Sequence, residues 1–191
     1  MKKVSISGAL RAHVGKKDAK KHRKEGNVPC VLYGGEKQIH FVGSEKDFGK
    51  IIFTPDAYLV NLVIDGTEYH AVLQDIQYHP VTDKILHMDF LQVFDDKPVS
   101  IAVPVRFTGT SKGVLRGGKL TKKYRKLMIK ALPAFLPDEV VVDITELNIG
   151  QAIKVNDLKM ENVEFLDVPT SVVATIQTTR GAALEGEGEA S

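Results

Sequence analysis

Apolar and polar residues alternate with a period of two along most of the chain, which is the pattern of half-buried β-strands. In the first such stretch, Val4 and Ile6 alternate with polar neighbours. Runs rich in β-branched and aromatic residues follow at 28–35, 39–42 and 57–64. Strands that follow one another this closely predict a barrel or a sandwich rather than a parallel sheet with crossover helices.

Turn and capping signals separate these strands. Asp65-Gly66 lies between two strand-like runs and predicts a tight hairpin, because a primed turn needs positive φ at both central residues. Two short helices are also predicted. The first covers residues 16–25, and the second begins with a Ser44/Asp47 capping pair and ends near residue 53.

A domain boundary is predicted near residue 95, where Asp-Asp-Lys-Pro follows a strand-like run and precedes a further strand-rich region. We therefore predict a mainly β protein with a few short helices, built from two β-rich domains at residues 1–94 and 95–180. Residues 181–191 carry too little apolar area for a packed core, so we expect a disordered acidic tail there.

Composition places the chain among ordinary globular proteins. Of its 191 residues, 43% are hydrophobic and 26% are charged, which excludes wholesale disorder. A single cysteine, Cys30, excludes a disulfide framework, and the sequence contains neither a signal-peptide pattern nor an apolar run of membrane-spanning length. We expect a soluble, cytoplasmic protein with no membrane partner.

The net charge of +2 conceals two basic blocks. Residues 1–30 hold nine Lys or Arg against two acidic residues, and residues 112–130 hold eight with no acidic residue. Two such blocks on a nearly neutral chain indicate contact with a polyanion at defined places. The alternative is that the blocks are solvated surface, which is common for basic segments.

The predicted helix at 16–25 is charged almost all round. Lys16, Lys20 and Arg23 fall on one side of it, with Lys21 beside them. Like charges at these spacings repel, so a helix of this kind favours an external partner such as a phosphate backbone. The alternative is a solvated cap over the end of a barrel.

A second cluster of polar residues lies in the segment 74–90. His87 and Asp89 share one strand face, opposite Leu86, Met88 and Phe90. Upstream, Asp75, Gln77 and His79 are alternate residues, which in a strand would face the same side. Tyr33 ends an earlier strand. Such a face can form hydrogen bonds with base edges and 2′-hydroxyls. A metal site of two His and one carboxylate, or a plain exposed face, are the alternatives.

Enzyme signals are weak. Residues 113–119 have the glycine spacing of a phosphate-binding loop, but Leu120 stands where that motif has Ser or Thr. Cys30 lies in an apolar strand and is interpreted as a buried small hydrophobe rather than a nucleophile. We predict no enzyme, no cofactor and no protein-bound metal. Any Mg²⁺ would belong to a bound RNA, because no cage of acidic ligands is apparent.

Four stretches of the chain carry a family resemblance. They are GKKDAKKHRKEGNVPCVLYGG (15–35), QDIQYHPVTDKILHMDF (74–90), GVLRGGKL (113–120) and EVVVDITELNIGQAIKVNDL (139–158). Up to about residue 178, the chain resembles the bacterial large-subunit ribosomal protein L twenty-five family in its long, two-domain form (CTC, general stress protein).

The resemblance implies an N-terminal six-stranded β-barrel that binds the loop E region of 5S ribosomal RNA, followed by a second β-rich domain. It also implies ribosome association, with neighbouring ribosomal proteins as further partners. The implied RNA contacts are Arg11, Lys16, Lys20, Lys21, Arg23, Tyr33, Gln77, His87 and Asp89. The chain departs from the family at 20 and 21, where Lys replaces Arg, and at His22, which replaces an apolar residue.

Two other functions remain open from the sequence. One is a stress-related β-barrel adaptor that binds protein partners away from the ribosome, and the other is a degenerate nucleotide hydrolase. Co-sedimentation with large ribosomal subunits would distinguish a ribosomal role from the adaptor. Nucleotide binding would support the hydrolase.

Overall fold

The computed structural model describes residues 1–179, which form two compact units. The first unit comprises Met1–Ile101 and Leu132–Asp138, and the second comprises Ala102–Ala131 and the chain from residue 139 onward. The chain is mainly β with short helices, as predicted. The predicted tail at 181–191 lies outside the described residues, and the domain limits at 94 and 180 stay a prediction.

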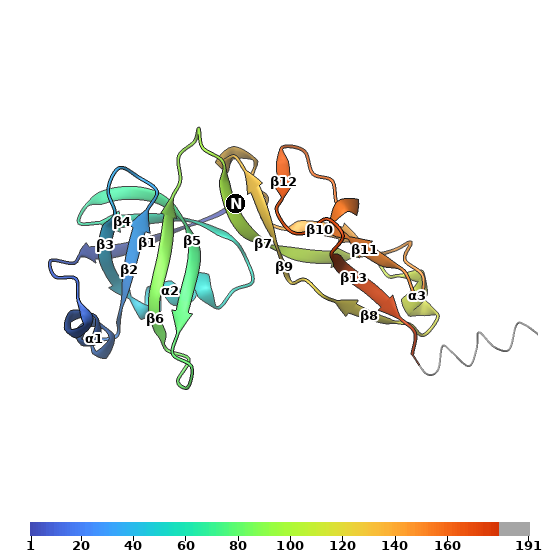
Figure 1. Cartoon of the computed structure of the whole chain (residues 1–191), viewed down its shortest axis with the longest axis horizontal. Coiled ribbons are helices and arrows are strands. Elements are labelled where there is room, and N and C mark those ends of the chain that lie inside the picture. The colour runs from blue at the N-terminus through green and yellow to red at the C-terminus, as the bar shows by residue number, and fades with distance from the viewer. Residues whose placement is uncertain (180–191) are drawn as a thin grey trace, which may run out of the picture. The chain divides into compact units, whose positions relative to one another are not determined.

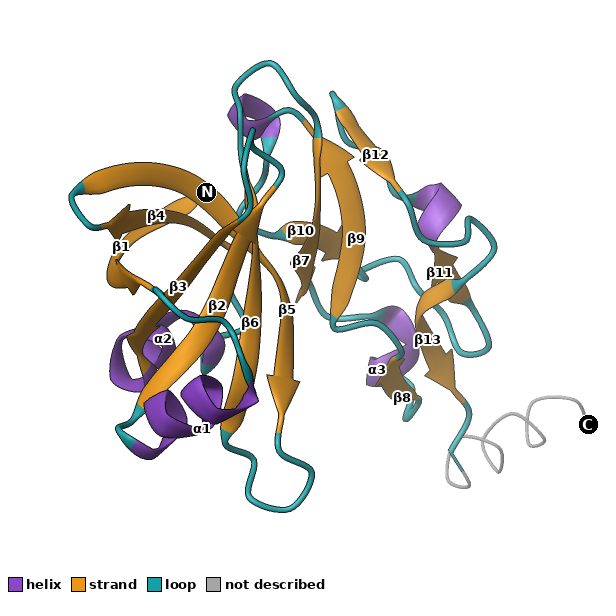
Figure 2. Ribbon diagram, turned by 60° about the vertical axis from the view of Figure 1, so that its left-hand side comes forward, coloured by secondary structure: helices purple, strands orange, loops and turns teal. Residues whose placement is uncertain are grey.

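The first unit is a closed barrel with strand order β1-β3-β2-β6-β5-β4 (Figures 1 and 2). The pairs β1–β4 and β2–β6 are parallel, and the other pairs are antiparallel. The six-stranded barrel is therefore confirmed. Its elements are β1 (Lys2–Leu10), α1 (Lys16–Lys24), β2 (Asn27–Tyr33), β3 (Ile39–Ser44), α2 (Glu45–Ile52), β4 (Tyr58–Ile64), β5 (Thr67–Tyr78) and β6 (Ile85–Gln92).

Aromatic rings fill the barrel. The ring centroids of Phe41 and Phe90 lie 5.8 Å apart, and those of Phe48 and Phe90 lie 5.9 Å apart, within the range of favourable aromatic pairs. Phe48 reaches the core from α2. Cys30 is fully buried in the same core, where burial raises the pKa of its thiol, so its interpretation as a small hydrophobe is confirmed.

Most of the predicted local signals correspond to structure. Asp65 and Gly66 both have positive φ and form the turn between β4 and β5. The chain leaves α1 through Gly26, which also has positive φ. The Ser44/Asp47 capping pair is wrong, because Ser44 is the N-cap of α2 but its side chain makes no capping hydrogen bond. Instead, the Glu45 N–H donates to the carbonyl of Gly26 at 3.1 Å.

Two register irregularities interrupt the pairing of β5 with β6. Leu73 pairs with Phe90 and Asp75 with Asp89, so Gln74 is an extra residue. Because a bulge shifts the alternation by one, Leu73 and Ile76 both pack against the core while Asp75 lies outside.

The second irregularity lies at Leu86. Gln77 pairs with His87 and Tyr78 with Ile85, which leaves Leu86 without a partner in this pairing. The prediction that Leu86, Met88 and Phe90 share the core-facing side of the strand is therefore correct only for Met88 and Phe90. Ile85 is the buried residue at this end of the strand, and Leu86 is half-buried.

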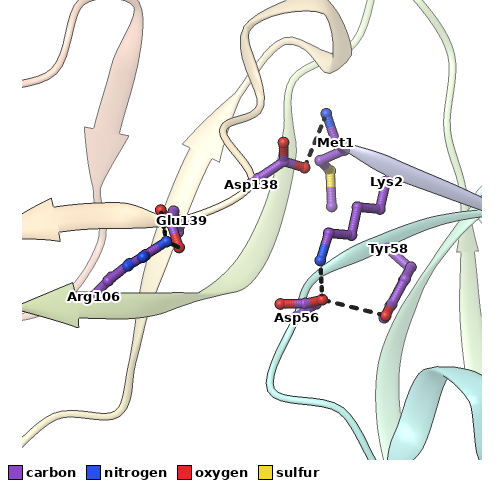
Figure 3. Close-up of polar contacts among 7 residues, drawn as sticks. All are labelled: Met1, Lys2, Asp56, Tyr58, Arg106, Asp138 and Glu139. Carbon is purple, nitrogen blue, oxygen red and sulfur yellow. Dashed lines mark hydrogen bonds and ion pairs between the residues drawn. The ribbon is translucent and has the colours of Figure 1, made fainter.

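Ion pairs fix the start of β1 (Figure 3). The N-terminal ammonium of Met1 lies 3.4 Å from Asp138 Oδ1, and the Lys2 ammonium pairs with Asp56. Asp56 also accepts a hydrogen bond from the Tyr58 hydroxyl at 3.4 Å. The Lys2 ammonium lowers the pKa of the Asp56 carboxyl, and that carboxylate raises the pKa of Lys2.

The second unit contains two open sheets, with strand orders β10-β7-β9-β12 and β11-β13-β8. Leu127, Ile129 and Ile176 are among its fully buried residues. The remaining elements of the chain are β7 (Val99–Thr108), α3 (Lys112–Leu115), β8 (Lys119–Lys122), β9 (Lys126–Ala131), η1 (Pro133–Phe135), β10 (Val140–Asp143), β11 (Ala152–Lys154), η2 (Val155–Asp157), β12 (Val163–Phe165) and β13 (Val172–Gln177). Among residues 1–179, no helix is long and apolar enough to cross a membrane.

The close packing of the Phe48 ring against Gly43 predicts that a larger residue at Gly43 destabilises the barrel. A Cβ added at Gly43 would lie 2.7 Å from the ring of Phe48, which is fully buried. Gly43→Ala should therefore lower the free energy of unfolding of the barrel by about 1–3 kcal/mol. The measurement is urea unfolding followed by tyrosine fluorescence, since Tyr33, Tyr58, Tyr69 and Tyr78 lie in the first unit and only Tyr124 in the second.

Gly15→Ala is the control, because Gly15 has an extended backbone and nothing lies within 4 Å of an added Cβ. It should change the free energy of unfolding by no more than about 0.5 kcal/mol. Equal effects of the two substitutions would contradict the packing argument.

Candidate nucleic-acid interface

Helix α1 presents its lysines to solvent. It has no buried residue, and no described residue forms an ion pair with any of its five lysines. All five are exposed: Lys16, Lys17, Lys20, Lys21 and Lys24. The predicted positions Lys16, Lys20 and Lys21 are therefore available to an anion, as a phosphate-binding helix requires.

Arg11 has an intramolecular partner. Its Nε and Nη2 donate to Asp18 Oδ2 at 3.0 and 2.7 Å, and its side chain is only 5% exposed. The Arg11 guanidinium lowers the pKa of the Asp18 carboxyl. Two donors on one carboxylate oxygen fix the first turn of α1 to the end of β1. The structure therefore gives Arg11 a positioning role, and its contact with RNA stays a prediction.

Arg23 connects α1 to the barrel wall. Its Nη1 donates to the carbonyl of Leu86 at 2.9 Å, at the second register irregularity of β5 and β6. Beside this contact lies a surface cavity of about 400 Å³, lined by residues that include Lys20, Arg23 and Lys84. With Lys24, four cations and one carboxylate, Glu45, line this open cavity, and the excess of positive charge makes it attractive to a phosphate group.

His22 occupies the position where the family resemblance has an apolar residue. Its side chain is 22% exposed, and its Nε2 lies 3.4 Å from Asp18 Oδ1. Its Nδ1 lies 3.9 Å from Glu25 Oε2 and has no hydrogen-bond partner. The half-buried ring thus faces one carboxylate of its own helix, Asp18, and that of the C-cap residue Glu25.

The outward face of β5 and β6 brings together three predicted RNA contacts, Gln77, His87 and Asp89, and one further polar residue, Asp75. Gln77 lies directly opposite His87, and Asp75 lies directly opposite Asp89. His87 Nδ1 lies 2.6 Å from Asp89 Oδ1, so the prediction that these two share a face is confirmed. Their side chains are 29% and 31% exposed, which leaves them accessible at the surface.

The Asp89 carboxylate determines which nitrogen of His87 is free. An ionised carboxylate only accepts hydrogen bonds, so the Nδ1 of His87 carries the proton in this pair. In the neutral ring, Nε2 is then an acceptor that points away from Asp89. A donor such as a 2′-hydroxyl or a base amine is the matching group on a ligand.

Tyr33 lies at the end of β2, next to this face. Burial raises the pKa of its hydroxyl, and the negative charges of Asp89 and Asp75 raise it further. The phenol therefore stays neutral and remains a hydrogen-bond donor. In the register of β2 with β6, Tyr33 lies beside Leu91, two residues along the strand from Asp89.

Two residues depart from the sequence-based view of this region. His79 does not continue the polar face, because the strand ends at Tyr78 and the His79 Nδ1 accepts from the Val81 and Thr82 N–H groups at 3.3 Å. Lys84 lines the cavity beside α1 and is not among the residues that the sequence predicts. A lone lysine in a turn carries no pattern that sequence analysis detects.

The alternative sites lack the required geometry. Within residues 1–179, no group of three or more His, Cys, Asp or Glu is placed to hold a metal ion. The glycines of the loop at 113–119 serve close packing. A Cβ at Gly113 would lie 2.7 Å from Ile149 N, and one at Gly118 would lie 2.6 Å from Ile176 Cγ2. Ser111, rather than a phosphate, accepts from the N–H groups of Gly113 and Val114.

Comparison with known proteins covers both units. The model of the ribosomal L25p family matches residues 6–90, and that of the C-terminal domain of ribosomal protein TL5 matches residues 98–180. The large ribosomal subunit protein bL25 of Amoebophilus asiaticus is 42% identical over 99% of this chain and 98% of its own length. The chain belongs to the bL25 family.

Two further members of the bL25 family show the same full-length similarity. The protein from Porphyromonas gingivalis is 42% identical over 95% of this chain and 96% of its own length. That from Cytophaga hutchinsonii is 44% identical over 94% of each chain. Because both units are matched, the chain has the long, two-domain form of the bL25 family.

The Arg11–Asp18 pair predicts a pH-dependent anchoring of α1. Asp18→Asn should speed amide hydrogen exchange in residues 16–24, because it removes the carboxylate that holds the first turn. Arg11 lowers the Asp18 pKa below its ordinary value of 3.8. The ion pair is therefore complete above that value and is lost as the pH falls through the lowered pKa.

Exchange in the original chain should accordingly approach that of Asp18→Asn as the pH is lowered below about 4. Asp47→Asn, on α2, is the control and should leave exchange in α1 unchanged. If Asp18→Asn had no effect on α1 at neutral pH, Arg11 would not be its anchor.

Proposed function

We propose that the chain is a structural constituent of the large ribosomal subunit and binds the loop E region of 5S rRNA through its first unit, without catalysis. Membership of the bL25 family and the names of its relatives support the ribosomal role. The exposed lysines of α1 and the polar face of β5 and β6 support an RNA ligand. Its place of action is then the ribosome in the cytoplasm.

The lysines of α1 contact phosphates in this proposal. Lys16, Lys20 and Lys21 repel one another in the free helix, and phosphate groups relieve that repulsion while counterions are released. Arg23 keeps free guanidinium donors besides the one used on Leu86. These contacts set orientation and affinity but carry no sequence information.

The polar sheet face provides the specificity. His87 offers Nε2 as an acceptor, Gln77 offers both donors and an acceptor, and Tyr33 offers a hydroxyl donor. Regular A-form RNA hides its base edges in a deep and narrow major groove. An irregular internal loop exposes them, so loop E is the kind of RNA that this face fits.

Asp89 acts through His87 as a positioning residue. The observation that carries the proposal is the 2.6 Å contact of His87 Nδ1 with Asp89 Oδ1, with Gln77 directly opposite on the neighbouring strand. That contact holds one ring nitrogen ready for a ligand on an accessible face. Arg11 and Asp18 similarly position α1 without needing to touch the RNA.

Substitutions at His87 and Lys20 should separate specificity from affinity. His87→Ala should weaken binding to a short loop E RNA by about 1–3 kcal/mol and hardly affect binding to a fully paired RNA of equal length. Lys20→Ala should weaken binding to both RNAs alike. The measurement is fluorescence anisotropy with the two labelled RNAs, with thermal unfolding to verify the fold.

His70→Ala and Lys37→Ala are the matched controls. His70 is exposed on β5 opposite Asn61, and Lys37 is exposed in the turn between β2 and β3. Neither should change binding to either RNA. Equal losses on both RNAs for His87→Ala would show that His87 does not read the loop.

The salt dependence of the affinity for loop E RNA measures the number of phosphate contacts. Four contacts, from Lys16, Lys20, Lys21 and Arg23, predict a slope of log K against log salt of roughly −3. Arg11 is left out because it is occupied by Asp18. A titration between 50 and 300 mM salt measures the slope, and a value near zero would remove α1 from the interface.

A further inference from the structure

The basic block at 112–130 lies in the second unit and has no role in the proposed contact with 5S rRNA. It extends over α3, the strand β8, the connection to β9, and β9 itself. All eight of its basic residues are exposed. Three have described partners: Lys112 pairs with Glu146, Lys130 lies 3.7 Å from Glu164, and Lys122 lies over the ring of Phe107.

Five cations of the block have neither an ion pair nor a ring contact with a described residue. We call these residues the basic edge: Arg116, Lys119, Lys123, Arg125 and Lys126. Three carboxylates of the second unit have partners other than these five cations. Glu139 pairs with Arg106, Asp143 accepts from Thr145, and Asp167 accepts from the Met128 N–H.

Backbone hydrogen bonds hold Lys119, Lys123 and Arg125 of the basic edge in place. β8 is the outer strand of its sheet, next to β13 (Figure 1). Lys119 lies directly opposite Gln177 on β13. The N–H groups of Lys123 and Tyr124 both donate to the carbonyl of Val173, at 3.0 and 3.3 Å. The Arg125 carbonyl accepts from the Val105 N–H at 2.9 Å. Backbone pairing therefore sets the spacing of these three charges, and Arg116 lies in the turn that follows α3.

We propose that the basic edge is a second RNA-binding surface, which contacts the phosphate backbone of an RNA strand. Strands β8 and β9 advance about 3.3 Å per residue, so the cations on and between them are spread along the chain as phosphates are spread along a polyanion. Tyr124 lies half-buried between Lys123 and Arg125, and an aromatic ring among cations is typical of single-strand binding surfaces. The choice of RNA over other polyanions rests on the proposed ribosomal role.

Lysines at a sheet edge also prevent strands from pairing with other chains. That role explains Lys119, which lies on the outer strand β8. It does not explain Arg116, Lys123 and Arg125, which lie outside the strands. Lysines that only prevent strand pairing can also be mixed with acidic residues along the chain, whereas residues 112–130 contain no Asp or Glu.

The test uses two triple variants of the full chain with equal charge change. Lys119→Gln/Lys123→Gln/Lys126→Gln removes three unpaired cations of the basic edge. Arg106→Gln/Lys112→Gln/Lys130→Gln removes three cations of the second unit that already pair with carboxylates. The probe is a labelled 20-nucleotide oligouridylate, measured by anisotropy from 50 to 300 mM salt, with thermal unfolding of both variants.

The basic-edge variant should weaken oligouridylate binding at least about tenfold near 0.1 M salt and reduce the salt slope by roughly 2. The variant with paired cations removed should change the affinity less than about twofold, because its cations are already neutralised. Equal losses for both variants, or no loss for the basic-edge variant, would overturn the proposal. Polyglutamate is the second probe, and equal weakening of its binding would overturn the assignment to RNA.

The short loop E RNA separates this proposal from the first. Neutralising the basic edge should leave loop E binding intact, whereas Lys16→Gln/Lys20→Gln/Lys21→Gln on α1 should remove it. If the α1 variant kept loop E binding while the basic-edge variant lost oligouridylate binding, the proposed function would fail and the second surface would stand. The reverse result would leave 5S rRNA binding in place and refute the basic edge.

Discussion

Closure of the six-stranded barrel is the constraint on which the first unit depends, because each residue of a closed strand must face either the core or the solvent. Strict alternation would give Asp75 and Gln77 the same side as Leu73, which packs in the core. The extra residue Gln74 shifts the alternation and moves both polar side chains outside. The polar face opposite His87 and Asp89 therefore exists because the pairing of β5 with β6 is irregular.

The same irregular pairing connects the basic helix to the sheet. At Leu86 the second extra residue leaves a carbonyl that accepts from Arg23, so α1 is attached beside the polar face. At its other end, α1 is held by Asp18, the one acidic residue of the helix. These two attachments position a helix of like charges and use none of its lysines, which stay available to an external anion.

The sequence predicts the regular parts of this arrangement and misses the irregular ones. Alternation predicts the strands, and the positive φ that Asp65-Gly66 requires predicts the hairpin. The shared face of His87 and Asp89 follows because both lie within one uninterrupted stretch of β6. The extra residues at Gln74 and Leu86 have no local signature, since register depends on the partner strand. The pairing of Arg11 with Asp18 has no local signature either, because it depends on how α1 folds back against β1. Ser44 shows a similar limit, because its side chain makes no capping hydrogen bond and the first N–H of α2 donates to the Gly26 carbonyl of another segment.

The central claim is that one outward surface, formed by α1 and the polar face of β5 and β6, binds the irregular loop of 5S rRNA. The most direct measurement is a titration of the ¹⁵N-labelled full chain with a short loop E RNA, followed by amide chemical shifts. The account predicts that the largest shifts fall in residues 16–24 and at Tyr33, Gln77 and His87, while buried positions such as Val60 on β4 hardly move. Largest shifts on β3 and β4, with α1 and β6 unchanged, would contradict it.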